Sequence, residues 1–495
     1  MITVKLNKRD FEYDIHSLVK AFYPREEVRV RCEEQTEEAI LKISVFYEEN
    51  RIRSVILDAE GKLLLDGASP IRQDMDRIEI KNVLKKLLYS QMKKLTGTSL
   101  PWGDLTGIRP TRIPMNLLEG GYEDAQILSL LEQEYLVSHQ KAALALSIAK
   151  RERALLEKID ARSGYSLYVG IPFCPSICLY CSFSSSPISM WKNRVDEYLE
   201  ALFREMAASK AYFQDKRLQT VYIGGGTPTT LTPDQLDRLL GQIEKNFDLS
   251  HVLEYTVEAG RPDSITREKL QVLRKHGISR ISINPQTMNQ KTLDVIGRIH
   301  TVERIRESFM LARELGFDNI NMDLIVGLPL EGEAEVKRTL EQIGELDPES
   351  VTVHSLALKR ATRLNLMKDL YQDISFENSD RIMDLCAASN ASRGLYPYYL
   401  YRQKNMAGNY ENVGYAREGA EGVYNILIME EIQSILALGA GASTKIVTGP
   451  SPCRIERIEN VKDIQNYIER IDEMILRKRK IYEYTTDHDA RTPLL

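Results

Sequence analysis

Three cysteines lie within eight residues in the segment YVGIPFCPSICLYCSF, residues 168–183. Cys174, Cys178 and Cys181 have C-x3-C-x2-C spacing. Thiolates are soft ligands that suit zinc or iron–sulfur clusters. Three of them on one tight loop can hold three corners of a cubane cluster and leave the fourth iron open, whereas a four-thiolate electron carrier is closed. The spacing therefore predicts a [4Fe–4S] cluster whose open iron can bind a substrate.

The alternative for this loop is a zinc knuckle, which needs a fourth ligand. The nearest histidines in the sequence are His139 and His251, and neither is close. The other three cysteines, Cys32, Cys386 and Cys453, are scattered, and we interpret them as packed or surface thiols. Six cysteines in a cytosolic chain of 495 residues argue against a disulfide framework.

Six short apolar runs with helical stretches between them begin at about Tyr165. Nearly all-apolar strands that alternate with helices predict a parallel sheet, and right-handed crossovers curl it into a partial (β/α)6 TIM-like barrel of the α/β class. Ligands of such folds lie at the carboxyl ends of the strands. The cysteine loop directly follows the first run. The six runs are LYVGIPF (167–173), TVYIGG (220–225), EYTVEA (254–259), RISINPQ (280–286), INMDLIVGL (320–328) and SVTVHSLA (350–357).

Three domains are expected, because the chain is too long for one ordinary core. Residues 1–160 predict an N-terminal α+β domain, with strands in 28–32, 39–49 and 52–65, helices over 16–23 and 78–95, and a helical connector. Residues 161–360 form the predicted barrel. Residues 361–495 predict a mixed α/β domain that covers the barrel mouth, with a helix over 425–436.

Composition restricts the function. Hydrophobic residues make up 43% and charged residues 28%, as in soluble globular proteins. The net charge of −5 argues against bulk nucleic-acid binding. No apolar run approaches the roughly 18 residues that cross a bilayer, and the N-terminus is not a signal peptide, so a cytoplasmic protein is expected.

The segment LYVGIPFCPSICLYC resembles the signature of the radical S-adenosylmethionine (SAM) superfamily, and within it the oxygen-independent coproporphyrinogen III oxidase family. The resemblance extends from about Tyr168 to Lys445. The additional N-terminal domain and the segment YYLYRQKNMAGN are similar to the HemZ-type branch. The resemblance implies a [4Fe–4S] cluster held by the three cysteines, one or two SAM molecules, and a low-potential electron donor of the flavodoxin or ferredoxin type.

Further site residues follow from the same resemblance. The glycine run after the second strand matches a segment that contacts the methionine part of SAM, which assigns this role to Gly225, Gly226 and Thr227. Read alone, the run equally fits an ordinary tight turn, while a phosphate loop is disfavoured because no Lys-Ser/Thr pair follows.

Four polar residues at or shortly after later strand ends match positions that contact SAM in the family: Glu258, Gln286, Arg298 and Asp323. Glu258 matches a glutamate whose carboxylate accepts hydrogen bonds from the SAM amine or ribose. Arg298 matches an arginine that suits a carboxylate, and Asp323 matches an aspartate placed for ribose hydroxyls. A solvated or helix-capping role fits Glu258 taken by itself, and lone Arg or Asp residues are usually surface charges. The assignment of these four residues to the SAM site depends on all of them occurring at strand ends in the order seen in the family.

A second SAM pocket is implied by Tyr168, Tyr180 and Ala357, and we also assign a catalytic role to Tyr168. Packing is an equally good interpretation of Tyr180. This chain differs from the best-studied oxidases at two positions, and these differences bear on the predicted decarboxylation activity more than on the predicted cluster. The best-studied oxidases carry a further cysteine where this chain has Phe183, and commonly a histidine where it has Gly170. Heme chaperones of the family also lack the further cysteine.

The implied function is oxygen-independent oxidative decarboxylation of two propionates of coproporphyrinogen III to vinyl groups, which yields protoporphyrinogen IX. A heme-binding or heme-delivery protein that keeps the cluster is the alternative, and a radical SAM enzyme acting on another tetrapyrrole is a third. A tetrapyrrole with four carboxylates requires basic pocket residues. The candidates are Lys359, Arg360, Arg363, Arg402 and Lys404, although a solvated basic face fits each one singly.

Overall fold

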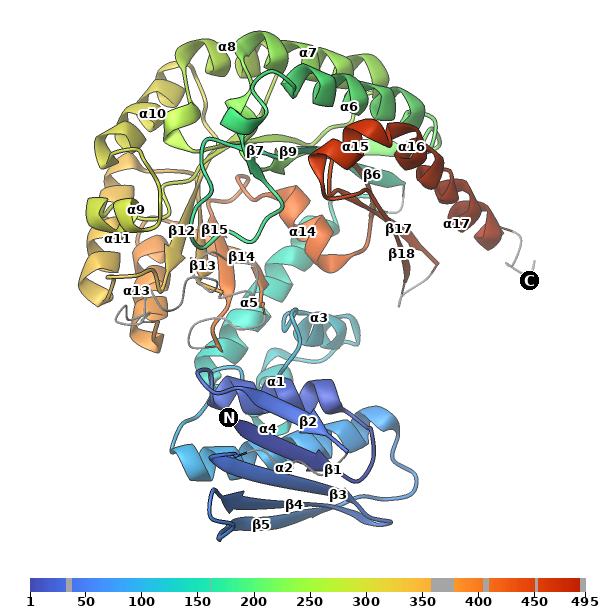
Figure 1. Cartoon of the computed structure of the whole chain (residues 1–495), viewed down its shortest axis with the longest axis vertical. Helices are drawn as coiled ribbons and strands as arrows, with labels where there is room; N and C mark the ends of the chain where they lie inside the picture. Colours follow the sequence, from blue (N-terminus) through green and yellow to red (C-terminus); the bar gives the residue numbers. More distant parts are fainter. Residues whose placement is uncertain (33–37, 162, 358–377, 404–408, 450–452, 490–495) are drawn as a thin grey trace. The chain divides into compact units, whose positions relative to one another are not determined.

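The computed structural model describes residues 1–32, 38–161, 163–357, 378–403, 409–449 and 453–489 (Figure 1). These residues form two compact units. The first contains the described residues of Met1–Lys150, Ala357–Lys359 and Leu400–Glu411, and the second contains those of Arg151–Leu356, Arg360–Tyr399 and Asn412–Leu495. The division into three domains stays a prediction.

The first unit is built on a five-stranded sheet with the order β2-β1-β3-β4-β5. Its core is apolar because alternate residues of the strands, such as Ile2 and Val4, pack with α1 and α2. The strand β1 was not expected, and residues 52–65 form parts of two antiparallel strands. The bounds are β1 Ile2–Leu6, α1 Glu12–Phe22, β2 Val28–Arg31, β3 Leu41–Tyr47, β4 Arg51–Asp58, β5 Leu63–Pro70 and α2 Arg77–Thr96.

Three helices follow in the chain, α3 Arg112–Glu119, α4 Asp124–Glu134 and α5 His139–Leu156. The later segment Leu400–Glu411 joins the first unit through a buried carboxylate. Trp102 Nε1 donates to Glu411 at 2.7 Å, and Lys141 Nζ lies 2.6 Å from the other Glu411 oxygen. All three side chains are buried. Pairing is required here because an unpaired buried carboxylate is costly.

The second unit contains an eleven-stranded sheet among the described residues, in the order β14-β15-β13-β12-β11-β10-β9-β6-β16-β17-β18. The six predicted barrel strands lie side by side in chain order and run parallel, which confirms the predicted fold class. Their bounds are β6 Gly164–Ile171, β9 Arg217–Gly225, β10 Glu254–Gly260, β11 Arg280–Ile283, β12 Ile320–Val326 and β13 Ser350–Ser355.

Helices cover the convex side of this sheet, and α14 Val423–Glu430 lies on the concave side (Figure 1). A Thr or Ser N-cap begins several of the helices. Thr232, for example, accepts from Gln235 N in a capping box. The other helices are α6 Val195–Ser209, α7 Pro233–Asn246, α8 Arg267–Lys275, α9 Gln290–Val295, α10 Val302–Glu314, α11 Glu333–Leu346, α13 Asp380–Ala391, α15 Ile464–Glu469, α16 Ile471–Lys478 and α17 Lys480–Asp489. No described helix is long and apolar enough to cross a membrane.

The predicted helix over 425–436 is wrong in its second half. The helix α14 ends at Glu430, Glu431 takes a left-handed backbone, and Ser434–Leu438 forms β16. The strand β16 pairs in parallel with β6, so tertiary pairing determines the structure of this apolar run. The remaining strands extend the sheet at both edges: β14 Tyr396–Tyr401, β15 Asn412–Ala416, β17 Ser443–Thr448 and β18 Arg454–Glu459. The short strands β7 Phe173–Cys174 and β8 Ser186–Pro187 pair separately.

A buried ion pair fixes the C-terminal helices against α6. Lys478 Nζ lies 2.9 Å from Glu205 Oε1, and both side chains are fully buried. The same carboxylate accepts from Tyr467 OH at 2.6 Å, Asn460 Nδ2 at 2.7 Å and Gly439 N at 2.9 Å. These four partners of Glu205 all belong to the C-terminal part of the chain, so this carboxylate holds that part to the barrel.

We predict that Lys478→Met destabilises the second unit by about 3–5 kcal/mol, because it leaves the Glu205 charge buried without its cation. Denaturant unfolding of both variants checks this, with Lys480→Met as the control because Lys480 is exposed two residues further on. Equal stabilities of the two variants would contradict the prediction.

Candidate active site

Alternation along the strands gives the concave face of the barrel a polar lining. Residues two apart share a face, so Tyr168 of β6 and Glu258 of β10 lie on the opposite face from the fully buried Val169 and Val257. Tyr168 is paired in register with Tyr222 of β9. The strand ends therefore bring tyrosine and carboxylate side chains together where parallel sheets bind ligands.

The cysteine loop is tied to its neighbours by backbone contacts at both ends. Phe173 O accepts from Thr227 N at 2.7 Å, and Leu179 N donates to Ile296 O at 3.0 Å. Thr227 Oγ1 lies 3.7 Å from Cys174 Sγ. Cys178 is buried and the other two cysteines of the loop are half-buried. Burial raises the pKa of the Cys174 thiol and raises that of Cys181 to about 11.

The chemistry of this donor set suits an iron–sulfur cluster. Among the described residues, no group of three His, Cys, Asp or Glu side chains converges on one metal ion. A cubane cluster takes each thiolate at a different iron, so its ligands need not converge on one point. None of the six cysteines forms a disulfide, and a soft trio of thiols on one short loop therefore fits the cluster.

The glycine run lies directly against the cysteine loop. Gly226 N donates to Ile171 O at 2.8 Å, and a Cβ added at Gly226 would lie 2.5 Å from Phe173 O. Gly225 has a φ of +105°, which side chains rarely adopt. Glycine is therefore required at both positions.

Gln286 occupies a strained position between strands. Its φ is +67°, its N–H donates to Asp323 O at 2.9 Å, and its carbonyl accepts from Ile325 N at 2.9 Å. The side chain is buried, and its Oε1 atom has no hydrogen-bond partner. Strain and an unsatisfied buried polar atom together are typical of ligand sites. Nearby, Asn321 Nδ2 donates to Asp323 at 2.7 Å. Burial alone would raise the pKa of Asp323, but His354 and Asn321 outweigh it and lower that pKa.

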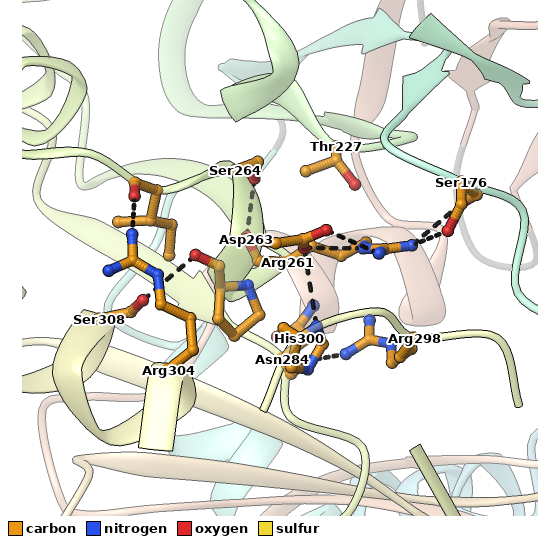
Figure 2. Close-up of polar contacts among 12 residues, drawn as sticks. Ser176, Thr227, Arg261, Asp263, Ser264, Asn284, Arg298, His300, Arg304 and Ser308 are labelled. Carbon is orange, nitrogen blue, oxygen red and sulfur yellow. Dashed lines mark hydrogen bonds and ion pairs between the residues drawn. The ribbon is translucent and has the colours of Figure 1, made fainter. Parts of the chain in front are cut away.

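Arg298 lies at the far side of the cysteine loop. Its guanidinium is buried, donates to the carbonyls of Asn284 and Pro285, and keeps an unpartnered Nε (Figure 2). Burial raises the pKa of Tyr180 well above its usual range, while the positive charge of Arg298 opposes that shift. The structure thus places Tyr180 in the electrostatic neighbourhood of both Arg298 and the cysteines.

A tyrosine stack beside Glu258 was missed by the sequence reasoning. The rings of Tyr222 and Tyr424 are 4.5 Å apart and 20° from parallel, and Tyr168 stacks 6.3 Å from Tyr222. Tyr222 OH donates to Glu258 Oε1 at 2.5 Å, and burial raises the pKa of Glu258 to about 7. Tyr424 is the second residue of α14 and lies far along the chain. The one signal in the sequence was the position of Tyr222, which alternates with the buried residues of its strand and so faces the concave side.

The other residues named from the sequence belong partly to the first unit and partly to the second. Ala357 belongs to the first unit. Arg402, also in the first unit, is buried and donates to Leu105 O at 2.7 Å. Phe183 is 73% exposed. A Cβ at Gly170 would contact Leu438 O at 3.3 Å, so the backbone is crowded there. Lys359, Arg360, Arg363 and Lys404 lie outside the described residues.

The fold and the site define the class. Residues 168–343 match the model of the radical SAM superfamily, whose members use a [4Fe–4S] cluster and SAM, and these are the cofactors of this chain. The chain is 41% identical over 416 residues to the oxygen-independent coproporphyrinogen-III oxidase-like protein HemZ of Bacillus subtilis, covering 82% of this chain and 83% of the relative. It therefore belongs to the oxygen-independent coproporphyrinogen III oxidase family, in its HemZ-type branch.

Two other relatives show the range of that family. The heme chaperone HemW of Bacillus subtilis is 33% identical over 325 residues, which cover 65% of this chain and 80% of the relative. The solved structure of coproporphyrinogen III oxidase (HemN) from Escherichia coli matches with a TM-score of 0.51 and 24% identity, over 65% of this chain and 73% of that one. That match confirms the fold.

We predict that Glu258→Gln makes the stability of the apoprotein less dependent on pH. With its pKa raised to about 7, folded Glu258 keeps a proton that the unfolded chain releases near pH 4.5. The residue thus lowers the free energy of unfolding as the pH rises from about 4.5 to about 7. The variant should be more stable than wild type by about 1–2 kcal/mol at pH 8 and similar at pH 4.5.

Denaturant titrations at several pH values measure the difference. Glu341→Gln, at an exposed position of α11, is the control and should keep the wild-type pH dependence. An unchanged pH dependence in Glu258→Gln would count against the buried, proton-holding carboxyl.

Proposed function

We propose that this chain is a radical SAM oxidoreductase that converts propionates of coproporphyrinogen III to vinyl groups by oxygen-independent oxidative decarboxylation, with protoporphyrinogen IX as the product. The observation that carries the proposal is the cysteine loop, docked by backbone hydrogen bonds on a glycine run at the carboxyl edge of a polar-lined barrel. The relationship to a coproporphyrinogen oxidase-like protein over most of the chain supports the tetrapyrrole class of substrate.

In this proposal Cys174, Cys178 and Cys181 hold the cluster, and Gly225, Gly226 and Thr227 receive the methionine part of SAM. When bound, the cluster with SAM would supply a 5′-deoxyadenosyl radical that removes a hydrogen atom from a substrate carbon, and loss of CO2 and of one further electron to an acceptor would then give the vinyl group. The chain's own groups bind the cluster and SAM and orient them. Glycines carry no side chain of their own, so their backbone groups can approach a ligand closely, and the half-buried loop restricts water around the reacting atoms.

Polar side chains at the later strand ends complete the SAM site. The unpartnered Gln286 Oε1 and Arg298 Nε are buried groups that a ligand would satisfy. An arginine of this kind suits a carboxylate. Asp323, with its lowered pKa, stays ionised and can accept from hydroxyl groups. Glu258 can hold or release a proton near neutral pH while Tyr222 fixes one of its oxygens.

Other assignments stay predictions within this proposal. Tyr168 is the catalytic candidate, and together with Tyr180 and Ala357 it would border a second SAM molecule. The stack on Tyr222 holds the Tyr168 ring in place on the concave face. A cover over the barrel mouth formed by residues 361–495 is part of the same proposal.

Heme delivery is the second candidate function. It is favoured by the relative named heme chaperone HemW, at 33% identity, and by Phe183, which stands where the best-studied oxidases carry a further cysteine. Under this alternative the chain binds heme and keeps the cluster, but does not decarboxylate coproporphyrinogen. A radical SAM reaction on another tetrapyrrole is the third.

We place the protein in the cytoplasm, where thiol ligands stay reduced, and expect a low-potential flavodoxin or ferredoxin type of electron donor. The reduction potential that the cluster needs lies at the low end of the range of about −700 to +450 mV seen for iron–sulfur clusters. Such a donor supplies the electron that reduces the cluster.

The reconstituted protein, incubated without air with coproporphyrinogen III, SAM and a reductant, should form vinyl product together with 5′-deoxyadenosine. Chromatography with mass spectrometry detects both. Cleavage of SAM without loss of CO2 from coproporphyrinogen would reject the oxidase assignment. Stoichiometric heme binding under those conditions would then favour delivery.

Replacing one ligand should remove the cluster. Cys178→Ala should lose the brown iron–sulfur absorbance and retain less than about half of the wild-type iron, because a cubane needs its thiolate corners. Cys386→Ala is the matched control, since Cys386 is a buried cysteine on α13. Four stable irons per chain in Cys178→Ala would show that the ligand assignment is wrong.

A further inference from the structure

Arg261 connects the end of β10 to the cysteine loop. Its side chain is 3% exposed. The Nε and Nη2 atoms donate to the two carboxylate oxygens of Asp263 at 3.0 and 2.8 Å. The third nitrogen, Nη1, donates across to Ser176, at 2.6 Å to Oγ and 3.2 Å to the carbonyl oxygen (Figure 2). The two-pronged contact with Asp263 fixes the plane of the guanidinium and aims Nη1 at the loop.

The same nitrogen reaches a cysteine. Arg261 Nη1 lies 3.9 Å from Cys178 Sγ, within hydrogen-bonding range for sulfur. Ser176 precedes Cys178 by two residues, and its Oγ donates to Gly297 O at 3.2 Å. The segment from Ser176 to Cys178 is thus held between Arg261 on one side and the backbone of residues 296–297 on the other.

A buried histidine, His300, lies next to the Asp263 carboxylate. His300 Nδ1 lies 3.7 Å from Asp263 Oδ1 (Figure 2). Burial lowers the pKa of His300. Burial would raise the pKa of Asp263, but His300 and Arg261 outweigh it and lower that pKa. The arrangement is therefore an ionised pair whose positive member faces the cysteine.

We propose that Arg261 is a positioning residue for the iron–sulfur cluster, which holds the Ser176–Cys178 segment and places one permanent positive charge beside the Cys178 thiolate. An electron that enters the cluster adds negative charge, and a cation fixed in a buried, low-dielectric setting stabilises that charge. Arg261 therefore raises the reduction potential of the cluster. The inference rests on the proposed ligand role of Cys178, but not on the identity of the tetrapyrrole.

A purely structural role is the competing explanation, because Arg261 and Asp263 also order the turn after β10. Arg304 allows the two to be separated. It donates to Ile265 O at 2.6 Å and so anchors the same turn, and no hydrogen bond or ion pair of the described structure joins it to the cysteine loop (Figure 2). Replacing Arg304 loosens the turn after β10 and leaves the positive charge beside Cys178 in place. It therefore tests the structural role of the turn by itself.

The test is a redox titration of the reconstituted protein, followed by the electron paramagnetic resonance signal of the reduced cluster. Arg261→Gln should lower the equilibrium constant for one-electron reduction about tenfold, which corresponds to about 59 mV. Arg261→Lys, which keeps the charge, and Arg304→Gln should titrate close to wild type. Hydrogen exchange of the apoprotein should also accelerate over residues 174–182 in Arg261→Gln and not in Arg304→Gln.

An unchanged potential in Arg261→Gln with wild-type iron content would overturn the inference, and so would equal shifts in Arg261→Gln and Arg304→Gln. If Arg261→Gln holds no cluster, Arg261→Lys decides: retention of four irons at the wild-type potential supports the charge, and loss of the cluster there as well overturns it. Wild-type protein without a four-iron cluster would reject the ligand assignment together with the inference. A normal cluster without vinyl product rejects only the proposed reaction.

Discussion

The structure of the site depends on backbone hydrogen bonds that fix a loop with little regular structure of its own. The bond from Thr227 N to Phe173 O holds the start of the cysteine loop, and that from Leu179 N to Ile296 O holds its later part. The donors and acceptors come from loops after three different strands, so the position of each cysteine depends on the whole parallel sheet. Side-chain contacts, such as that of Arg261 with Ser176, add to a framework that the main chain already determines.

The same dependence explains what could be predicted from the sequence. The six barrel strands were predicted correctly because buried parallel strands are near-continuous apolar runs, and the strand ends then located the cysteines and the glycine run. Glu258, Gln286, Arg298 and Asp323 were assigned through family resemblance, and periodicity alone left each of them ambiguous. The structure adds physical reasons for two of them, since Gln286 and Arg298 keep unsatisfied buried atoms.

Other features could not be predicted because they are long-range. Tyr424 reaches Tyr222 only when α14 lies on the concave side of the barrel. The Glu205–Lys478 pair joins residues more than 250 positions apart, and nothing local marks either one. The apolar run 425–436 suits a helix by composition, yet its second half becomes β16 because the edge of β6 offers a backbone partner. In each case tertiary contact decides between local alternatives that are otherwise close in free energy.

The pairing of β6 with β16 also has a consequence for biosynthesis. The strand β6 emerges from the ribosome roughly 260 residues before β16. At a synthesis rate of about 5–20 residues per second, one side of β6 stays without its partner for on the order of 13–50 s. An open strand edge is a site for pairing with other chains. During this interval the nascent chain therefore carries an open strand edge with which another chain can pair.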